Sequence, residues 1–217
     1  MYFVLEIKDI ENLEDKLSGK IPVTREELIA LINTHGRKNG FNLEIIDINT
    51  DILIEYYIKK SNPNECLPLE NLDVSKIQDF SHVFCGSYYN GDLSKWKLSG
   101  DCFAMFENSE FNNNSLKYLD FKDIKHAGFM FYRSEFCGDI SGWKNYNETI
   151  HIYNVFADNK NFKEKYYQMQ EVSFDYSKET KQWLDENLER IREINRPKDE
   201  IILDYFDFDD NNLDLER

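Results

Sequence analysis

One spacing, apolar-x-x-apolar-x-apolar, recurs along the chain every 23 to 34 residues and constrains the fold more than any other feature. Its copies begin at Leu43, Leu69, Leu93, Leu116, Ile140, Met169 and Leu203; the copy at Ile140 is a variant with one extra residue, and the last two are the weakest. A second motif, an apolar residue followed by Phe, keeps step with the middle copies at Val83-Phe84, Met105-Phe106, Met130-Phe131 and Val155-Phe156. Because two motifs stay in register over several copies, we interpret them as a structural repeat.

A period of 20 to 29 residues with this spacing is typical of leucine-rich repeats. Each copy is expected to form a short strand, in which Leu119 and Phe121, for example, face the core while Asp120 faces outward. The apolar-Phe pair is expected to line the opposite wall, so that stacked units share one core. The sequence therefore predicts an α+β fold, a leucine-rich-repeat-like solenoid with short parallel strands, an N-terminal α/β cap and a C-terminal helix.

Two stretches resemble the F-N-G-D-I-S-x-W-D-V-S repeats of BspA-type leucine-rich-repeat proteins: FSHVFCGSYYNGDLSKWKLS and FMFYRSEFCGDISGW. The resemblance is strongest over residues 69–162 and extends upstream to the helix-like TREELIALINTHGRKNG. Such repeats are widespread in low-GC bacteria and mycoplasmas, and the proteins that carry them are usually surface or secreted adhesion and interaction proteins. The resemblance implies a repeat fold and an interaction role, and it names no reaction.

Both ends of the chain are predicted to close the stack. Thr24 and Glu27 fit a capping box at the start of a helix that ends at Gly36, and the apolar segment 2–7 fits a strand. A second helical pattern opens at Ser177 and ends before Pro197. We predict one domain, made of a cap (1–42), a solenoid (43–176), and a final helix, strand and acidic tail (177–217).

The charge of the chain limits its partners. Acidic residues outnumber basic ones 41 to 26, for a net charge of -15. Nucleic acids and anionic membranes would repel such a chain, so we expect a protein partner, with a basic nucleic-acid-binding protein as a special case. The apolar run at the N-terminus ends at Glu6, too early for a signal peptide, and no window approaches 18 apolar residues. Alanine is scarce while Asn, Ile, Lys and Tyr are frequent, as expected of an AT-rich genome. Together these features predict a cytoplasmic protein of a bacterium or a phage-infected host cell.

Residues with reactive or metal-binding side chains show no known catalytic motif. The four cysteines, Cys66, Cys85, Cys102 and Cys137, form no C-x-x-C pair, so we expect reduced thiols. The nearest arrangement to a metal site is His82 with Cys85 and Cys102, but no second close pair completes it, so we predict no metal and no cofactor.

Other polar residues recur with the repeat. His126 and His151 occupy equivalent positions, and Asp92 and Asp139 recur in turns, where they are expected to bond to the local backbone. Such recurrence favours structural roles, so we predict that the chain is not an enzyme.

The residues between the apolar positions of the motif are expected to form one outward-facing strip, which we name the outer strip. Its members are Asp73, Lys95, Lys97, Lys117, Tyr118, Asp120, Lys144, Asp204, Tyr205 and Asp207. Ordinary solvated charge explains such a strip as well as a docking face does. Our leading hypothesis is a non-catalytic protein-binding module, with inhibition of a host defence nuclease as a special case.

Two alternatives remain open. One is an acidic nucleic-acid mimic whose tail, residues 199–217, carries eight carboxylates against one arginine. The other, less favoured, is an enzyme with an unrecognised site.

Overall fold

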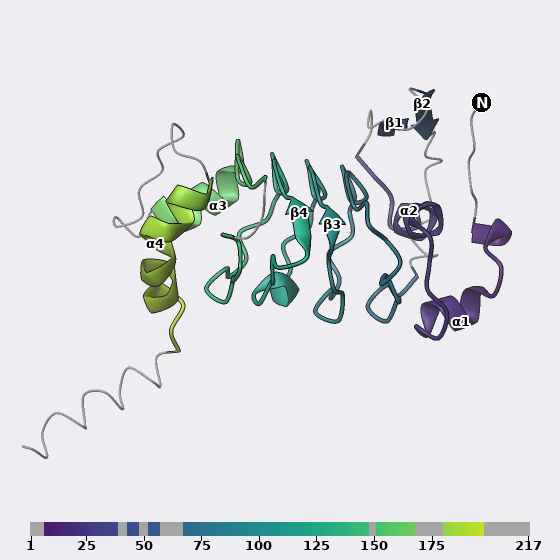
Figure 1. Ribbon diagram of the computed structural model, residues 1–217, viewed down its shortest axis with the longest axis horizontal. Coiled ribbons are helices and arrows are strands. Elements are labelled where there is room, and N and C mark those ends of the chain that lie inside the picture. The colour runs from purple at the N-terminus through teal and green to yellow at the C-terminus, as the bar shows by residue number, and fades with distance from the viewer. Residues whose placement is uncertain are drawn as a thin grey trace, which may run out of the picture.

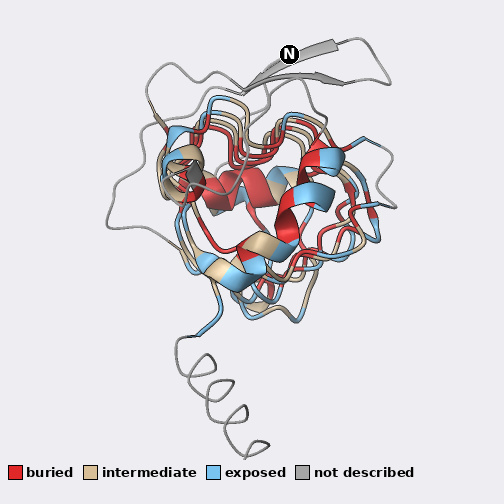
Figure 2. Cartoon of the chain, turned by 90° about the vertical axis from the view of Figure 1, so that its left-hand side faces the viewer, coloured by how far each residue is buried: buried red, intermediate tan, exposed pale blue. Residues whose placement is uncertain are grey.

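The computed structural model describes residues 7–38, 43–47, 52–56, 67–147, 151–167 and 180–197. Its central part is a row of coils that lie side by side between helices at either end (Figure 1). Seen along the row, buried residues lie on the inner side of the coils and exposed residues on the outer side (Figure 2). One hydrophobic cluster extends from Ile10 to Ile191. The division into cap, solenoid and C-terminal part stays a prediction.

Short helices begin the described chain: η1 (Ile7–Asp9), α1 (Leu13–Leu17) and α2 (Arg25–Asn33). The predicted capping box of α2 is confirmed, because Thr24 accepts a bond from the N–H of Glu27 while Glu27 accepts one from the N–H of Thr24. The middle of α2, from Leu28 to Ile32, is buried. Residues 2–6 of the predicted first strand lie outside the described residues, and Ile7 opens η1.

The segment that follows differs from the predicted first repeat. Strands β1 (Leu43–Asp47) and β2 (Ile52–Tyr56) pair antiparallel, with Leu43 opposite Tyr56 and Asp47 opposite Ile52. The prediction that Leu43 opens a parallel repeat unit is therefore wrong. A nearby apolar segment offers a local partner, and closing the short connection 48–51 costs less chain entropy than reaching the next copy, 26 residues away.

Adjacent coils are joined by backbone hydrogen bonds between residues 21 to 26 positions apart. Alternate N–H groups of one coil donate to carbonyls of the next, as in Phe84 to Met105, Phe106 to Met130 and Phe131 to Val155, at 2.8–2.9 Å. Strands β3 (Gly100–Asp101) and β4 (Ile124–His126) pair in parallel within this ladder. This ladder of backbone hydrogen bonds thus runs through the side of each coil that carries the apolar-Phe pair. Whether the stack is a leucine-rich repeat stays a prediction.

In the four motif copies that begin at Leu69, Leu93, Leu116 and Ile140, the first half forms a turn rather than the predicted strand. The N–H of Leu119 donates to the carbonyl of Leu116, and the equivalent residues of three other coils, Leu72, Trp96 and Trp143, bond in the same way. Residues three apart face opposite sides of a strand, whereas a turn brings both to one side, and Leu116 and Leu119 are both buried. In the second half the predicted facing is observed, because Leu119 and Phe121 are buried while Asp120 lies outside the core. Asp120 forms an isolated parallel bridge with Lys144 rather than part of a strand.

Aromatic side chains repeat from coil to coil inside the stack. Phe84, Phe106, Phe131 and Phe156 form one ladder, in which neighbouring rings lie 4.9–6.0 Å apart and within 10° of parallel. Phe111, Phe136 and Phe162 form a second ladder beside it. The two matching tryptophans each donate to a carbonyl of the preceding coil, Trp96 to Leu69 and Trp143 to Leu116. One ring per coil in each ladder therefore fills the core.

Two arginines close the N-terminal edge of the stack. The carbonyls of Asp79, Ser81, Val83 and Cys85 are equivalent to those that accept from a preceding coil elsewhere in the ladder. Here Arg25 donates to Asp79 and Ser81 at 2.8–2.9 Å, and Arg37 donates to Val83 and Cys85 at 2.5–2.6 Å. Arg37 is only 8% exposed, and burial lowers its pKa to about 10, so it remains charged at neutral pH. The guanidinium groups thus replace the backbone donors of a further coil.

Helices α3 (Lys160–Tyr167) and α4 (Thr180–Ile194) lie at the opposite end (Figure 1). Asn159 joins α3 to the stack, because its side chain accepts from the N–H of Phe162 and donates to the carbonyl of Phe136. Helix α4 turns one apolar face inward: Trp183, Leu184, Leu188 and Ile191 are buried and Ile194 is half-buried. The predicted final strand and the acidic tail lie outside the described residues.

Candidate protein-binding surface

Seven members of the outer strip lie in the described part of the chain, and none of them is buried. Lys95, Lys97, Tyr118 and Lys144 are exposed, and Asp73, Lys117 and Asp120 are half-buried. They lie outside because the apolar residues beside them, such as Trp96 and Leu119, fill the core. Asp204, Tyr205 and Asp207 lie outside the described residues, so their place in the strip stays a prediction.

The charged residues of the strip bond between neighbouring coils. Lys144 Nζ lies 3.2 Å from Asp120 Oδ2, and Lys117 Nζ lies 2.9 Å from Asp139 Oδ2. Lys95 donates to Asn71 at 2.6 Å. These contacts join the coils in two pairs along one face. The surface around the centre of the strip is therefore ordered by contacts on both sides.

Aspartates that recur at the start of the turns bond to their own backbone, as predicted. Asp92 accepts from the N–H of Ser94 at 2.7 Å and Asp139 from the N–H of Ser141 at 2.8 Å. The bonds from Ser94 hold the pKa of Asp92 below its usual value. Burial favours a raised pKa for Asp139, but Lys117 and Ser141 outweigh burial, and its pKa is lowered. Both carboxylates therefore act as ionised turn-forming groups at neutral pH.

Tyr118 is the most exposed large hydrophobic residue that the structure describes, at 72%, followed by Tyr88 at 49%. Its ring lies over Gly142 of the next coil, where an added Cβ would approach Tyr118 Cδ1 to 2.3 Å. Lys117 Nζ lies 5.4 Å from the centre of the same ring. The tyrosine therefore rests on backbone below it and beside a cation, with its other face in solvent.

Replacing Asp139 by asparagine tests the electrostatics of this face. Because the pKa of Asp139 is lowered on folding, its ionised form stabilises the fold above about pH 4, and this contribution is lost as the pH falls through the lowered value. Asp139→Asn should be less stable than the wild type at pH 7, and the difference should shrink toward pH 2. Urea unfolding at both pH values measures it. A difference that stays constant with pH would contradict the assignment.

The recurrence of the histidines is confirmed. His126 and His151 form a parallel bridge, and their ring centres lie 5.5 Å apart. His126 also lies 3.4 Å from Asp101 and 3.3 Å from the hydroxyl of Tyr153. His82 and Cys85 lie together with Glu107, whereas Cys102 is buried in the hydrophobic cluster. The described cysteines, Cys85, Cys102 and Cys137, are free.

Comparison with known proteins identifies the family. A family model described as "Mycoplasma protein of unknown function, DUF285" matches residues 54–170, more than half of the chain. The chain belongs to this family. The DUF285 match contains the stacked coils and most of the outer strip. Searches of curated proteins and of solved structures found no match. Among the residues described, no helix is long and apolar enough to cross a membrane.

A second group of side chains in the DUF285 segment was not predicted from the sequence. Phe103, Phe129, Tyr132 and Tyr153 are half-buried, and their rings touch at centre distances of 5.5–5.9 Å. The residues immediately before the apolar-Phe pairs include Phe129, a signal that pattern analysis could have used. This group adds apolar surface on the side of the coils that carries the apolar-Phe pairs.

Proposed function

We propose that the chain is a non-catalytic module that binds another protein through the outer strip, with Tyr118 at its centre. The exposure and support of Tyr118 carry the proposal: the residue is 72% exposed and its ring rests on Gly142. Tyrosine is among the residues that most often dominate binding energy at interfaces. A ring confined before binding also loses less conformational entropy when a partner covers it.

The charges around Tyr118 support a specific partner. Lys117, Lys144, Asp120 and Asp139 form two ion pairs that alternate in sign across adjacent coils. Charges at the rim of an interface mainly set orientation and association rate, whereas a central aromatic supplies affinity. A partner that complements this face would present an apolar pocket bordered by charges of both signs.

We also propose that the coils are repeats of the BspA type. Two observations support this finer assignment within the family. Trp96 and Trp143 occupy the same motif position and make the same bond to the preceding coil. Asp92 and Asp139, in the N-G-D and C-G-D sequences, make the same bond to a serine N–H two residues later. Inhibition of a host defence nuclease is a special case of such binding.

Affinity purification with matched variants tests the function. The wild type, Tyr118→Ala and the control Tyr88→Ala serve as baits in a lysate of the cells that produce the protein. A protein recovered in stoichiometric amount by the wild type and by Tyr88→Ala should bind Tyr118→Ala about 30-fold more weakly, equivalent to about 2 kcal/mol. Recovery of the same partner with equal affinity by all three baits would place the interface elsewhere.

The nucleic-acid mimic remains the second candidate because the net charge is -15. Under that alternative the acidic tail replaces phosphates in a basic groove, and binding depends steeply on salt. Deleting residues 209–217 should then weaken binding and flatten its salt dependence. Docking through Tyr118 predicts that this deletion leaves the affinity almost unchanged.

A further inference from the structure

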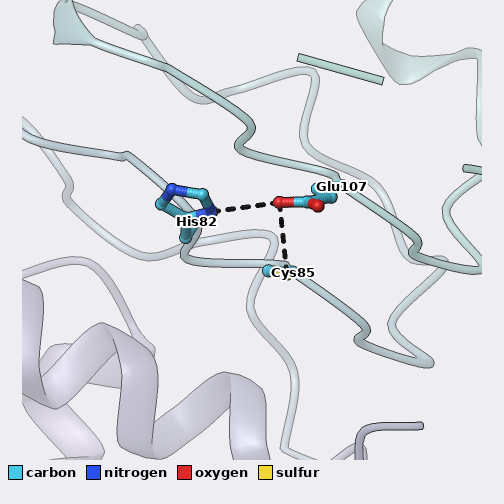
Figure 3. Close-up of side chains that lie close together, drawn as sticks. All are labelled: His82, Cys85 and Glu107. Atoms are coloured by element: carbon cyan, nitrogen blue, oxygen red, sulfur yellow. Dashed lines mark hydrogen bonds and ion pairs between the residues drawn. The ribbon is translucent and has the colours of Figure 1, made fainter. Parts of the chain in front are cut away.

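Three side chains with different metal-binding atoms meet at the N-terminal end of the stack. His82 and Cys85 come from one coil and Glu107 from the next (Figure 3). Glu107 Oε2 lies 3.3 Å from His82 Nδ1 and 3.8 Å from Cys85 Sγ. All three ligand atoms lie within 4.8 Å of one another. Elsewhere in the described residues, no further group of this kind occurs.

We propose that His82, Cys85 and Glu107 form a binding site for a divalent cation of the zinc type. Zinc binds sulfur at about 2.3 Å, and nitrogen and carboxylate oxygen at about 2.1 Å, in tetrahedral geometry. Ligand atoms around such an ion lie about 3.4 to 3.6 Å apart, by the geometry of a tetrahedron with these bond lengths. The two distances to Glu107 Oε2, 3.3 and 3.8 Å, bracket this range.

The donor set selects the class of ion. One sulfur, one imidazole nitrogen and one carboxylate oxygen suit Zn²⁺, whereas Ca²⁺ and Mg²⁺ require six or more oxygen ligands. A thiolate and a carboxylate together neutralise the two charges of the ion. Because the thiol must lose its proton on binding, one proton is released and the affinity rises with pH.

The surroundings leave room for a fourth ligand. The side chains of His82 and Glu107 are 30% and 25% exposed, so one side of the group faces solvent, while Cys85 is buried. Three protein ligands and one water complete a tetrahedral zinc site with an open position. On the inner side, Arg37 donates to the carbonyl of Cys85 and fixes the backbone of the turn. The site thus lies on the first coil, whose backbone carbonyls are held by Arg25 and Arg37.

Cobalt titration of the full chain tests the site directly, because Co²⁺ replaces Zn²⁺ and reports its ligands in the absorption spectrum. The expected result is a sulfur-to-cobalt charge-transfer band and tetrahedral d–d bands that saturate at one ion per chain and vanish when Zn²⁺ is added. Titration of the wild type without a charge-transfer band, or without saturation at one ion, would overturn the proposal.

Matched variants assign the ligands. Cys85→Ser should abolish the charge-transfer band, and His82→Asn should abolish stoichiometric binding. Asparagine is chosen to replace His82 because it tolerates a positive φ: His82 has a φ of 56°, and Asn154, at the equivalent position of another coil, has a φ of 50°. The control Cys137→Ser should bind like the wild type. Loss of the band in Cys137→Ser but not in Cys85→Ser would refute the site, and circular dichroism confirms that each variant is folded.

Discussion

Replacing Arg37 by methionine is expected to lower the free energy of unfolding by about 3 kcal/mol, one of the two largest losses that the structure predicts. Methionine fills much of the same space but donates no hydrogen bond. The carbonyls of Val83 and Cys85 would lose their donors in a buried setting, and each buried unsatisfied polar group costs about 1 to 3 kcal/mol. Urea unfolding followed by circular dichroism measures the loss.

Arg133→Met is the matched control. The side chain of Arg133 is 60% exposed and forms a surface contact with Asp158 at 3.4 Å. Exposed ion pairs contribute at most about 1 kcal/mol, so this variant should unfold close to the wild type. Equal midpoints for the two methionine variants would show that Arg37 does not close the stack.

Phe131→Ala should cost about 3 to 5 kcal/mol, the range found when a buried phenylalanine is truncated. Its ring is fully buried and stacks on Phe106 at 5.1 Å and on Phe136 at 4.1 Å. The cavity would interrupt both ladders in the middle of the stack. Phe129→Ala, two residues away and half-buried, should cost clearly less, and denaturant unfolding of both variants measures the difference. A larger loss for Phe129→Ala would contradict the observed ladder.

Much of the architecture follows from sequence periodicity. The apolar-Phe pairs locate the Phe ladder in the core. A capping box and helical spacing locate α2, and helical spacing alone locates α4. The turn at the start of the four motif copies in the coils was missed because leucine spacing alone does not distinguish a turn from a strand. The distance of three between Leu116 and Leu119 is the signal that favours a turn, since a strand repeats every two residues.

Other features depend on contacts that no local pattern contains. Arg25 and Arg37 donate hydrogen bonds to carbonyls 46 to 56 residues away. The sequence around the two arginines does not show that these carbonyls belong to the first coil and receive no bond from a preceding one. Ala104 and Phe129 have positive φ values of 50° and 55°, although neither residue favours this conformation. Interactions along the whole stack determine these positions, and they override local preference.

The candidate surface shows the same division. Alternation of apolar and polar residues predicted which side chains of the outer strip lie outside the core. It did not predict that Lys117 pairs with Asp139, or that Tyr118 rests on Gly142, because these contacts join different coils. The sequence predicted only part of the group of His82, Cys85 and Glu107. His82 and Cys85 are close in sequence, whereas Glu107 is supplied by the next coil.

Site-specific photo-crosslinking tests the proposed docking surface most directly. A benzophenone amino acid replaces Tyr118 in one version of the full chain and Tyr88 in another, and both are irradiated in cells that produce the protein. Our account predicts one dominant crosslinked protein from position 118 and none from position 88. Crosslinks to the same protein from position 88 but not from position 118 would contradict the proposal that the outer strip is the binding surface.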